Sequence, residues 1–348
     1  MLRHLVLLGL GQAHRALLDS LARRMPADLD VTLITRRHAW AEPDALLRRI
    51  ALHQALGAET VQDLPSLVRR SGIRWVAEPV AAVEAARKRL HLEDGRNLRF
   101  DWLSVETEPE QIRDEVERQM PGARSNGLFL HPLDDLARLW PRVQQLADSR
   151  PLRFAVTSSP ASPAGTVQAM EWSFTLREAW PQSAVTWVAG ADALAWASPA
   201  MRDALRRLLS RHRITLLEDV ACRVEPDELH LASGARLACD VPLLAGPCQP
   251  AAWLAASDLA LDSAGHASAV SGFEHVLVTP WQHSDRARRI TSDVRRLLQG
   301  QPPSRSQAPA LHPANVRTGS RTALVEAFGM TWGQSWLGGR VANALLRR

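Results

Sequence analysis

The chain has 348 residues, of which 46% are hydrophobic and 23% charged, and a formal net charge of +5. This length predicts two domains rather than one core, and no apolar run approaches the roughly 18 residues of a membrane span. The positive charge does not predict a nucleic-acid partner, because Lys88 is the only lysine and the arginines are scattered among acids. Cys222, Cys239 and Cys248 are widely spaced, so neither dithiol chemistry nor a bound metal is expected.

A β-turn-α-β unit is predicted at the N-terminus. Residues 4–8 form a short apolar run, which is typical of a buried parallel strand, and Gly9 and Gly11 break it. Apolar residues at helical spacing follow over 16–21, and the β-branched run 31–34 predicts a second strand. Since the chain opens on a strand rather than on a signal peptide, we expect a cytoplasmic protein.

A second unit of the same kind is predicted after residue 150, and an internal repeat accompanies the two units. Residues 152–156 and 185–188 predict strands, with a helix over 170–180 between them. Residues 90–101 and 229–240 match at both leucines that flank a histidine, at the histidine, and at a later glycine, leucine and aspartate. Each copy predicts a small β-meander with a glycine turn. Chance similarity of two hairpins is the alternative interpretation.

Four segments carry a resemblance to a known family: residues 5–14, 100–107, 239–246 and 318–321. They are similar to the opening strand and phosphate turn, to two strand ends near the cofactors, and to a C-terminal Thr-Gly segment of that family. The family is the FAD-dependent pyridine nucleotide-disulfide oxidoreductases. The branch that the chain resembles includes type II NADH dehydrogenases, sulfide:quinone reductases and the oxidoreductase associated with selenide, water dikinase.

The resemblance implies an α/β fold with two Rossmann-like dinucleotide-binding domains, each with a parallel sheet and a β-meander. In this family the second domain is inserted into the first. For this chain, that layout predicts a discontinuous FAD-binding-like domain over residues 1–149 and 268–348. It predicts an NAD(P)-binding-like domain over residues 150–267.

The resemblance also implies FAD at the first turn. Gly9 would permit the tight turn, and Gly11 would let the backbone approach a pyrophosphate at the helix N-terminus. His131, which precedes Pro132 where the family has a basic residue, could move a proton near a flavin and is the candidate catalytic residue. A structural histidine is the alternative. The implied cofactor contacts are Gly9, Gly11, Ala13, His14, Thr35, Arg36, Val80, Thr107, Thr279, Trp281 and Gln282.

Three departures from the family pattern bear on the cofactors. The second glycine turn is replaced over 157–165 by Thr-Ser-Ser-Pro-Ala-Ser-Pro-Ala-Gly, whose prolines lack the N–H groups that cradle a phosphate. The family's late Gly-Asp pair is replaced by Thr-Pro-Trp-Gln over 279–282, where Trp281 could stack on a ring or simply pack. The acid after the second strand is replaced by Thr35-Arg36-Arg37, which could face a phosphate or the solvent.

Two functional hypotheses follow. The first is an FAD-dependent oxidoreductase that passes electrons between a small donor and a quinone, oxygen or small organic substrate, without ordinary NAD(P)H binding. The alternative is a cofactor-less relative that serves as a binding or accessory subunit in a biosynthetic assembly. The expected partners are therefore a small-molecule substrate or another protein. The C-terminal segment 332–346, with its tryptophans and leucines among arginines, could rest on a membrane surface or form a packed helix. The oligomeric state is not predicted.

Overall fold

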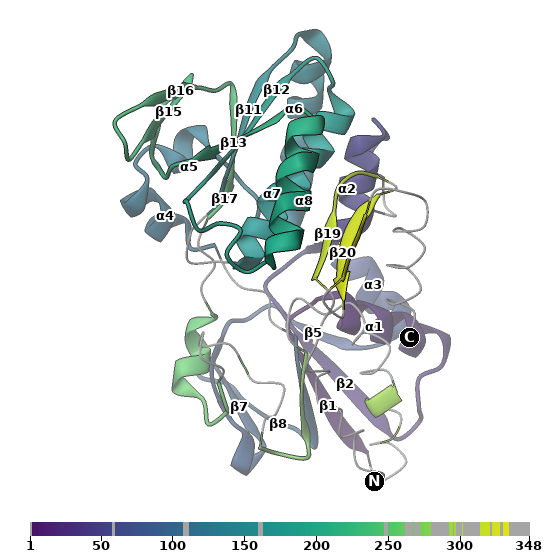
Figure 1. Ribbon diagram of the computed structural model, residues 1–348. Coiled ribbons are helices and arrows are strands. Elements are labelled where there is room, and N and C mark those ends of the chain that lie inside the picture. The colour runs from purple at the N-terminus through teal and green to yellow at the C-terminus, as the bar shows by residue number, and fades with distance from the viewer. Residues whose placement is uncertain are drawn as a thin grey trace. The chain divides into compact units, whose positions relative to one another are not determined.

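Two compact units make up the chain (Figure 1). The computed structural model describes residues 2–57, 60–106, 111–158, 163–246, 250–261, 267, 272–279, 292–294, 296, 301, 314–320, 322–327 and 330–333. Unit 1 contains Met1–Trp40, Gln62–Glu110 and Gln249–Ala310, and unit 2 contains Ala41–Val61, Gln111–Cys248 and Leu311–Arg348.

Unit 1 is built on a five-stranded parallel sheet with the order β18-β9-β1-β2-β5. Strand β1 is central, and the chain leaves it first towards β2 and returns later on its other side as β9. The strand order therefore reverses between β1 and β9, which is the topological switch point of a dinucleotide-binding fold. The strands are β1 (Arg3–Leu8), β2 (Leu29–Ile34), β5 (Arg74–Val76), β9 (Trp102–Val105) and β18 (Val276–Val278).

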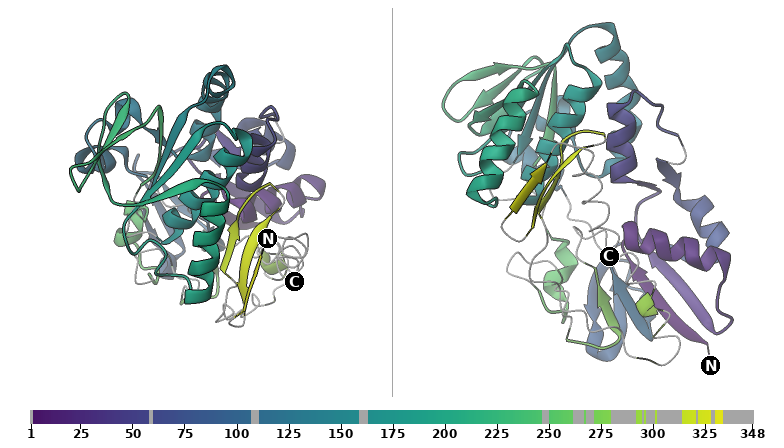
Figure 2. Two further views of the ribbon diagram at one scale, coloured as in Figure 1. Left: turned by 45° about the horizontal axis from the view of Figure 1, so that its top comes forward. Right: turned by 45° about the vertical axis from the view of Figure 1, so that its right-hand side comes forward.

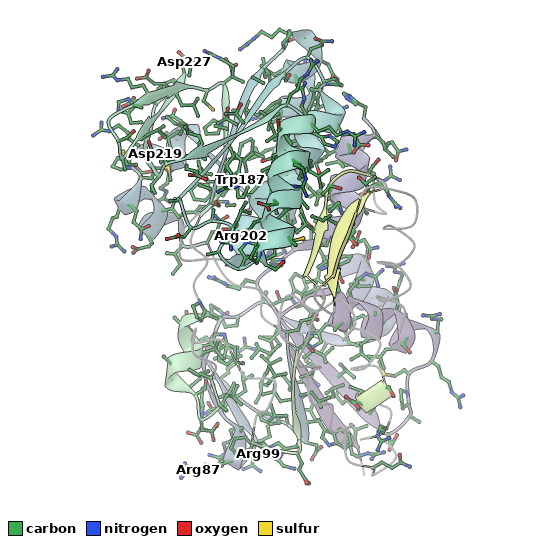
Figure 3. All side chains as sticks on the ribbon, viewed as in Figure 1. Arg87, Arg99, Trp187, Arg202, Asp219 and Asp227 are labelled. Carbon is green, nitrogen blue, oxygen red and sulfur yellow. The ribbon has the colours of Figure 1, made fainter. Side chains whose placement is uncertain are left out.

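The two faces of the unit 1 sheet are covered by different layers, because successive strand side chains point to opposite sides. Leu5 and Leu7 pack with the helices α1 (Gln12–Arg23) and α3 (Leu64–Ser71). Val6 and Leu8 pack with the β-meander. The meander consists of β6 (Val80–Glu84), β7 (Arg89–Leu92) and β8 (Asn97–Arg99), with the short helix η1 (Ala85–Arg87) between β6 and β7. Arg87 and Arg99 extend from its outer side (Figure 3).

Unit 2 repeats this plan with the parallel order β10-β17-β11-β12-β13. Its switch point lies between β11 and β17. The strands are β10 (Leu128–Phe129), β11 (Arg153–Ser158), β12 (Ala184–Ala189), β13 (Ile214–Glu218) and β17 (Val241–Ala245).

One face of the unit 2 sheet carries helices and an aromatic core. Trp140 and Trp172 pack with ring centroids 5.3 Å apart, and Trp187 is fully buried within the unit (Figure 3). The helices are α2 (Pro43–Ala51), α6 (Leu133–Ser149), α7 (Pro163–Ala179) and α8 (Pro199–Arg211). The other face packs on a meander of β14 (Ala221–Val224), β15 (Glu228–Leu231) and β16 (Arg236–Ala238).

The remaining elements are connections and a C-terminal sheet. The antiparallel ribbon β19-β20-β21 lies beside α7 and α8 in each view (Figures 1 and 2). These elements are β3 (Ala39–Ala41), β4 (Val61–Asp63), α4 (Arg113–Gln119), α5 (Ala123–Asn126), η2 (Ala252–Ala256), β19 (Ala314–Arg317), β20 (Ala323–Ala327) and β21 (Met330–Gly333).

The predicted fold class is confirmed: both units are Rossmann-like, with a parallel sheet and a β-meander each. The two copies of the sequence repeat are the two meanders. Leu90 and Leu229 are both fully buried. Gly95 and Gly234 turn the chain with φ of +85° and +87°, in the left-handed region that favours glycine.

The aspartate that ends each repeat forms two hydrogen bonds with the backbone at the start of a strand of the main sheet. Asp101 accepts a hydrogen bond from the His4 amide at 2.7 Å, and its own amide donates to the His4 carbonyl at 2.8 Å. Asp240 makes the same pair of bonds with Arg153, both at 2.8 Å. In each unit the repeat therefore ties the start of the returning strand to the start of the first strand.

The contacts divide the chain at other positions than the sequence suggested. We expected residues 41–61, 111–149 and 311–348 to belong with the N-terminal segment, and residues 249–267 with the middle one. Instead α6 packs into the tryptophan core of unit 2, and β19 contacts α7. Leu254 and Leu259 pack in unit 1 beneath its meander. Tertiary packing, which the local pattern does not reveal, assigns these segments.

Asp240 supports a prediction about stability. Its carboxylate also accepts hydrogen bonds from the Arg153 and Arg150 guanidinium groups at 3.0–3.2 Å, and the Arg153 bonds above all hold the pKa of Asp240 well below its usual range. We expect Asp240→Asn to lower the free energy of unfolding by about 1–2 kcal/mol at neutral pH, with the half-exposed arginines limiting the loss. The contribution is present above the unfolded pKa, about 3.9, and is lost as the pH falls through the lower folded pKa.

Urea denaturation of the wild type and the variant over an acid series measures this difference. Asp101→Asn is the matched control, since Asp101 binds the equivalent amide but no guanidinium among the described residues. Equal losses for the two variants would contradict the role of the arginines.

Candidate functional site

The carboxyl ends of the unit 1 strands meet at one edge of the sheet. In the register, Leu8 pairs with Ile34 and with Val105, and Val105 pairs with Val278. The residues that directly follow these strands therefore lie along one edge: Gly9, Thr35, Glu106 and Thr279. Ligands of open α/β sheets bind at this edge, at the switch point between β1 and β9.

The turn between β1 and α1 has the backbone of a phosphate-binding turn. Gly9 has a φ of +87°, and its amide donates to the Ile34 carbonyl at 3.0 Å. Gly11 is the N-cap of α1 and supplies no capping side chain. The first amides of a helix have no partner within it, so the start of α1 presents hydrogen-bond donors and the positive end of the helix dipole.

The Glu106 carboxylate occupies this helix start. Oε1 accepts a hydrogen bond from the Ala13 amide at 2.8 Å, and Oε2 accepts one from the His14 amide at 2.6 Å. Glu106 follows β9 directly and is only 5% exposed. It therefore does for α1 what an N-cap side chain does for other helices, but from 92 or more residues further along the chain.

Gly11 is required by the same carboxylate. A Cβ atom added at Gly11 would lie 2.5–2.8 Å from Cδ, Oε1 and Cγ of Glu106. A dinucleotide pyrophosphate at this turn would need both the space next to Gly11 and the amides of Ala13 and His14. The backbone of the turn fits the pyrophosphate of FAD, but the Glu106 side chain in this position does not.

His14 joins the turn to β9. Its Nδ1 lies 2.7 Å from the Gly9 carbonyl oxygen and its Nε2 lies 2.8 Å from the Ser104 hydroxyl. Because a carbonyl only accepts, Nδ1 donates to Gly9, and the second hydrogen bond joins Nε2 to the Ser104 hydroxyl. Both side chains are fully buried, so this serine–histidine pair anchors the turn and is inaccessible to a substrate. The histidine takes the place where the family pattern has a small residue.

The other predicted cofactor residues differ in how far they are buried. Val80 is buried at the start of β6, and Thr279 is buried with its amide donating to the Val105 carbonyl at 2.8 Å. Thr35 is half-buried and its Oγ1 accepts from the Arg37 amide at 3.3 Å, whereas Arg36 is exposed. Thr107, Trp281 and Gln282 lie outside the described residues.

His131 belongs to unit 2, whereas the other predicted site residues that the structure describes belong to unit 1. It is 3% exposed. Its amide donates to Oε1 of Gln111 at 2.7 Å, and its Nε2 donates to Oε1 of Gln168 at 3.0 Å. Gln111 in turn donates to the Leu244 carbonyl at 2.9 Å, near the end of β17. His131 is thus held in a chain of polar side chains at the carboxyl ends of β10 and β17.

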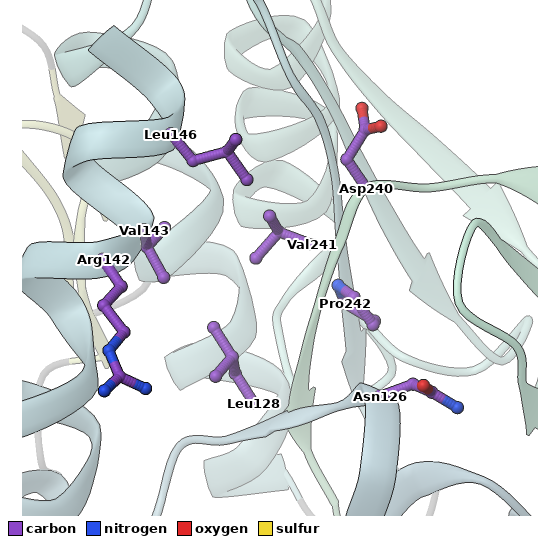
Figure 4. Close-up of a pocket in the computed structure, with 8 residues that line it drawn as sticks. All are labelled: Asn126, Leu128, Arg142, Val143, Leu146, Asp240, Val241 and Pro242. Carbon is purple, nitrogen blue, oxygen red and sulfur yellow. The ribbon is translucent and has the colours of Figure 1, made fainter. Parts of the chain in front are cut away.

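The described cysteines and a cavity in unit 2 add no chemistry at these edges. Burial raises the pKa of Cys239 to about 12, which makes it a poor nucleophile, and Cys248 lies outside the described residues. A cavity of about 200 Å³ lies at the amino ends of β10 and β17, the opposite edge from the switch point (Figure 4). In the part of the chain that the structure describes, no cluster of His, Cys, Asp or Glu could hold a metal ion, and no helix is long and apolar enough to cross a bilayer.

No family model and no curated protein matches the sequence. Solved structures match it closely in fold. The sulfide:quinone oxidoreductase from Aquifex aeolicus superposes with a TM-score of 0.69 at 13% identity, over 99% of this chain and 90% of that one. NDH2 from Plasmodium falciparum in complex with NADH gives 0.68 at 9% identity, over 99% and 94%.

The NAD-dependent persulfide reductase from A. fulgidus gives a TM-score of 0.68 at 14% identity, over 98% of this chain and 65% of that one. The chain has the fold of the pyridine nucleotide-disulfide oxidoreductase-like family. The resemblance predicted from the sequence is therefore confirmed at the level of the fold.

The sequence did not single out Glu106, Ser104, Gln111 or Gln168. One signal could have revealed Glu106: it is an acid directly after a strand that returns to the switch point, where the free amides of a helix favour a negative charge. No comparable local pattern marks the two glutamines.

The Gly11–Glu106 contact generates a prediction. Gly11→Ala should lower the free energy of unfolding by about 1–3 kcal/mol, because the new methyl group must push Glu106 from α1. In a Glu106→Ala background the same change should cost little, since the obstructing side chain is gone. A double-mutant cycle by chemical denaturation should give an interaction energy of about 0.5–3 kcal/mol. Additive losses would show that the two residues do not compete for this space.

Proposed function

We propose that the chain is an FAD-dependent oxidoreductase that passes electrons between a small donor and a quinone, oxygen or small organic substrate. The observation that carries the proposal is the turn with Gly9 and Gly11, which opens α1 at the switch point between β1 and β9. In open α/β sheets this is where dinucleotides bind. The similar solved structures, which include a sulfide:quinone oxidoreductase and an NDH2, support it through the shared fold.

The chain's own residues would bind and orient the cofactor, which would supply the redox chemistry. Once Glu106 moves aside, the amides of Ala13 and His14 are two donors for a phosphate. Thr279 follows β18 at the same edge, and Val80 packs in the cluster that contains Leu8 and Ile34, the last residues of β1 and β2. His131 remains a proposed proton carrier. Its hydrogen bonds to Gln111 and Gln168 would hold the imidazole in one orientation.

The partner is proposed to be a small molecule or another protein. One structure with a TM-score of 0.69 and 16% identity, over 93% of this chain and 81% of that one, is a covalent putidaredoxin reductase–putidaredoxin complex. A reductase of this fold can therefore serve a protein partner. Cys222 and Cys239, the cysteines that the structure describes, are both free and Cys239 is buried, so electrons would pass directly to the acceptor rather than through a pair of these cysteines.

A second candidate function is a cofactor-less binding or accessory subunit. The observation that favours it is the Glu106 carboxylate on α1, since the chain itself supplies the anion that a nucleotide would otherwise bring. In unit 2 the chain Gln111–His131–Gln168 similarly fills the ends of the strands with the protein's own polar groups.

FAD binding separates the two candidates. For the oxidoreductase we expect the purified protein to show flavin absorbance, and added FAD to raise the melting temperature, because a ligand that binds only the folded state stabilises it. Adenosine, which lacks the pyrophosphate, is the control and should give a smaller shift. A colourless protein that FAD does not stabilise would leave the accessory function in its place.

We expect little affinity for NADH or NADPH in unit 2. Residues 159–162 lie outside the described residues, but Pro160 and Pro163, the latter the first residue of α7, remove two amides from the segment 157–165. Titration calorimetry with NADH should give no heat of binding above that of dilution. Tight binding that Ser159→Trp abolishes would contradict this interpretation of the turn.

A further inference from the structure

The Glu106 carboxylate and a nucleotide phosphate need the same groups. A phosphate at the start of α1 would accept hydrogen bonds from the first amides of the helix. In this structure those of Ala13 and His14 are bound at 2.8 and 2.6 Å by the two oxygens of one carboxylate. Both hydrogen bonds are charge-assisted, and they lie at the positive end of a 12-residue helix.

The fit of the carboxylate is specific. Each oxygen takes one amide, the side chain is nearly buried, and Gly11 leaves the volume that it fills. His14 and Ser104 fix the turn and β9 to each other from the other side, so the distance from the end of β9 to the start of α1 is set by buried hydrogen bonds. While these buried hydrogen bonds hold, an anion that enters must therefore displace Glu106.

We propose that Glu106 is a built-in competitor for the dinucleotide phosphate, so that the cofactor occupies unit 1 only when the carboxylate swings away from α1. This inference rests on the proposed function, since it places the phosphate of FAD at the same helix start. The two anions exclude each other for two reasons: they would share two donors, and they would repel one another in a nearly buried place.

The competition reduces the apparent affinity for the cofactor. The binding-competent state is the fraction of molecules in which Glu106 is displaced, and the apparent dissociation constant rises in inverse proportion to that fraction. Since the displaced state loses two charge-assisted hydrogen bonds, we expect removal of the carboxylate to tighten FAD binding by roughly tenfold or more.

The test compares FAD binding by the wild-type protein, Glu106→Ala and a control. Flavin fluorescence during titration of FAD gives the dissociation constant for each. Glu106→Ala should bind FAD at least roughly tenfold more tightly than the wild type. Glu93→Ala is the matched control, because it removes the same charge from an exposed position on the unit 1 meander and should leave the constant unchanged.

The outcomes distinguish this inference from the proposed function. Equal, tight FAD binding by the wild type and Glu106→Ala would overturn the competition and leave the oxidoreductase standing. If no variant binds FAD, the proposed function fails, and the competition is decided with inorganic phosphate. A rise in melting temperature with phosphate in Glu106→Ala, but not in the wild type, supports it, and equal shifts overturn it.

Loss of the carboxylate also removes the cap of α1, so folding is checked by circular dichroism. Glu106→Ser, which keeps a short acceptor and leaves room for a phosphate, replaces the alanine variant if that variant does not fold. If phosphate restores the folded state of either variant, the result supports the exchange of one anion for the other. If neither variant folds even in phosphate, the carboxylate is irreplaceable and the inference is overturned.

Discussion

The structure of unit 1 depends on how the start of α1 is satisfied. A helix that begins at the centre of a parallel sheet brings unpaired amides and a positive dipole to the switch point, and something negative must face them. In this chain Glu106 at the end of β9 does so. The contact links the first strand–helix pair to the strand that returns much later in the chain. It therefore ties the local turn to the topology of the whole sheet, and it decides whether the unit can admit a nucleotide.

The same constraint appears in unit 2 in another chemical form. Its switch point lies between β11 and β17, and the ends of β10 and β17 are lined by the hydrogen-bonded chain Gln111–His131–Gln168 rather than by a carboxylate. At the opposite edge, Asp101 and Asp240 join the strand starts through the same pair of hydrogen bonds to the backbone. The amino ends of the strands are thus joined by the same hydrogen bonds in both units. The carboxyl ends, where a ligand would bind, carry different polar groups in each unit. Differences of function should therefore be sought at the carboxyl ends of the strands.

Local sequence patterns predicted much of the fold and little of the site. Strand β1, the turn at Gly9 and the two meanders follow from periodicity and glycine placement, which act within a few residues. The assignment of α6 to unit 2 depends on Trp140 meeting Trp172, a contact between surfaces that no local pattern encodes. No local pattern marks Glu106 either, because its hydrogen-bond partners are more than 90 residues away in the chain. A side chain that satisfies a distant helix has no periodicity of its own, so only the strand order reveals it.

The retained glycine at position 11 has a different meaning once Glu106 is considered. In the sequence, a glycine at this place indicates that a backbone approaches a pyrophosphate. In the structure, the same missing Cβ makes room for a carboxylate, since an added methyl group would lie 2.5 Å from Cδ of Glu106. Selection for either occupant would keep the glycine, so its presence alone does not identify a nucleotide site. What distinguishes the two is the residue after β9. A small residue there leaves the helix start open to a phosphate. With a glutamate, binding exchanges one anion for another, and the free energy of that exchange depends on the ligand's additional contacts elsewhere along the edge.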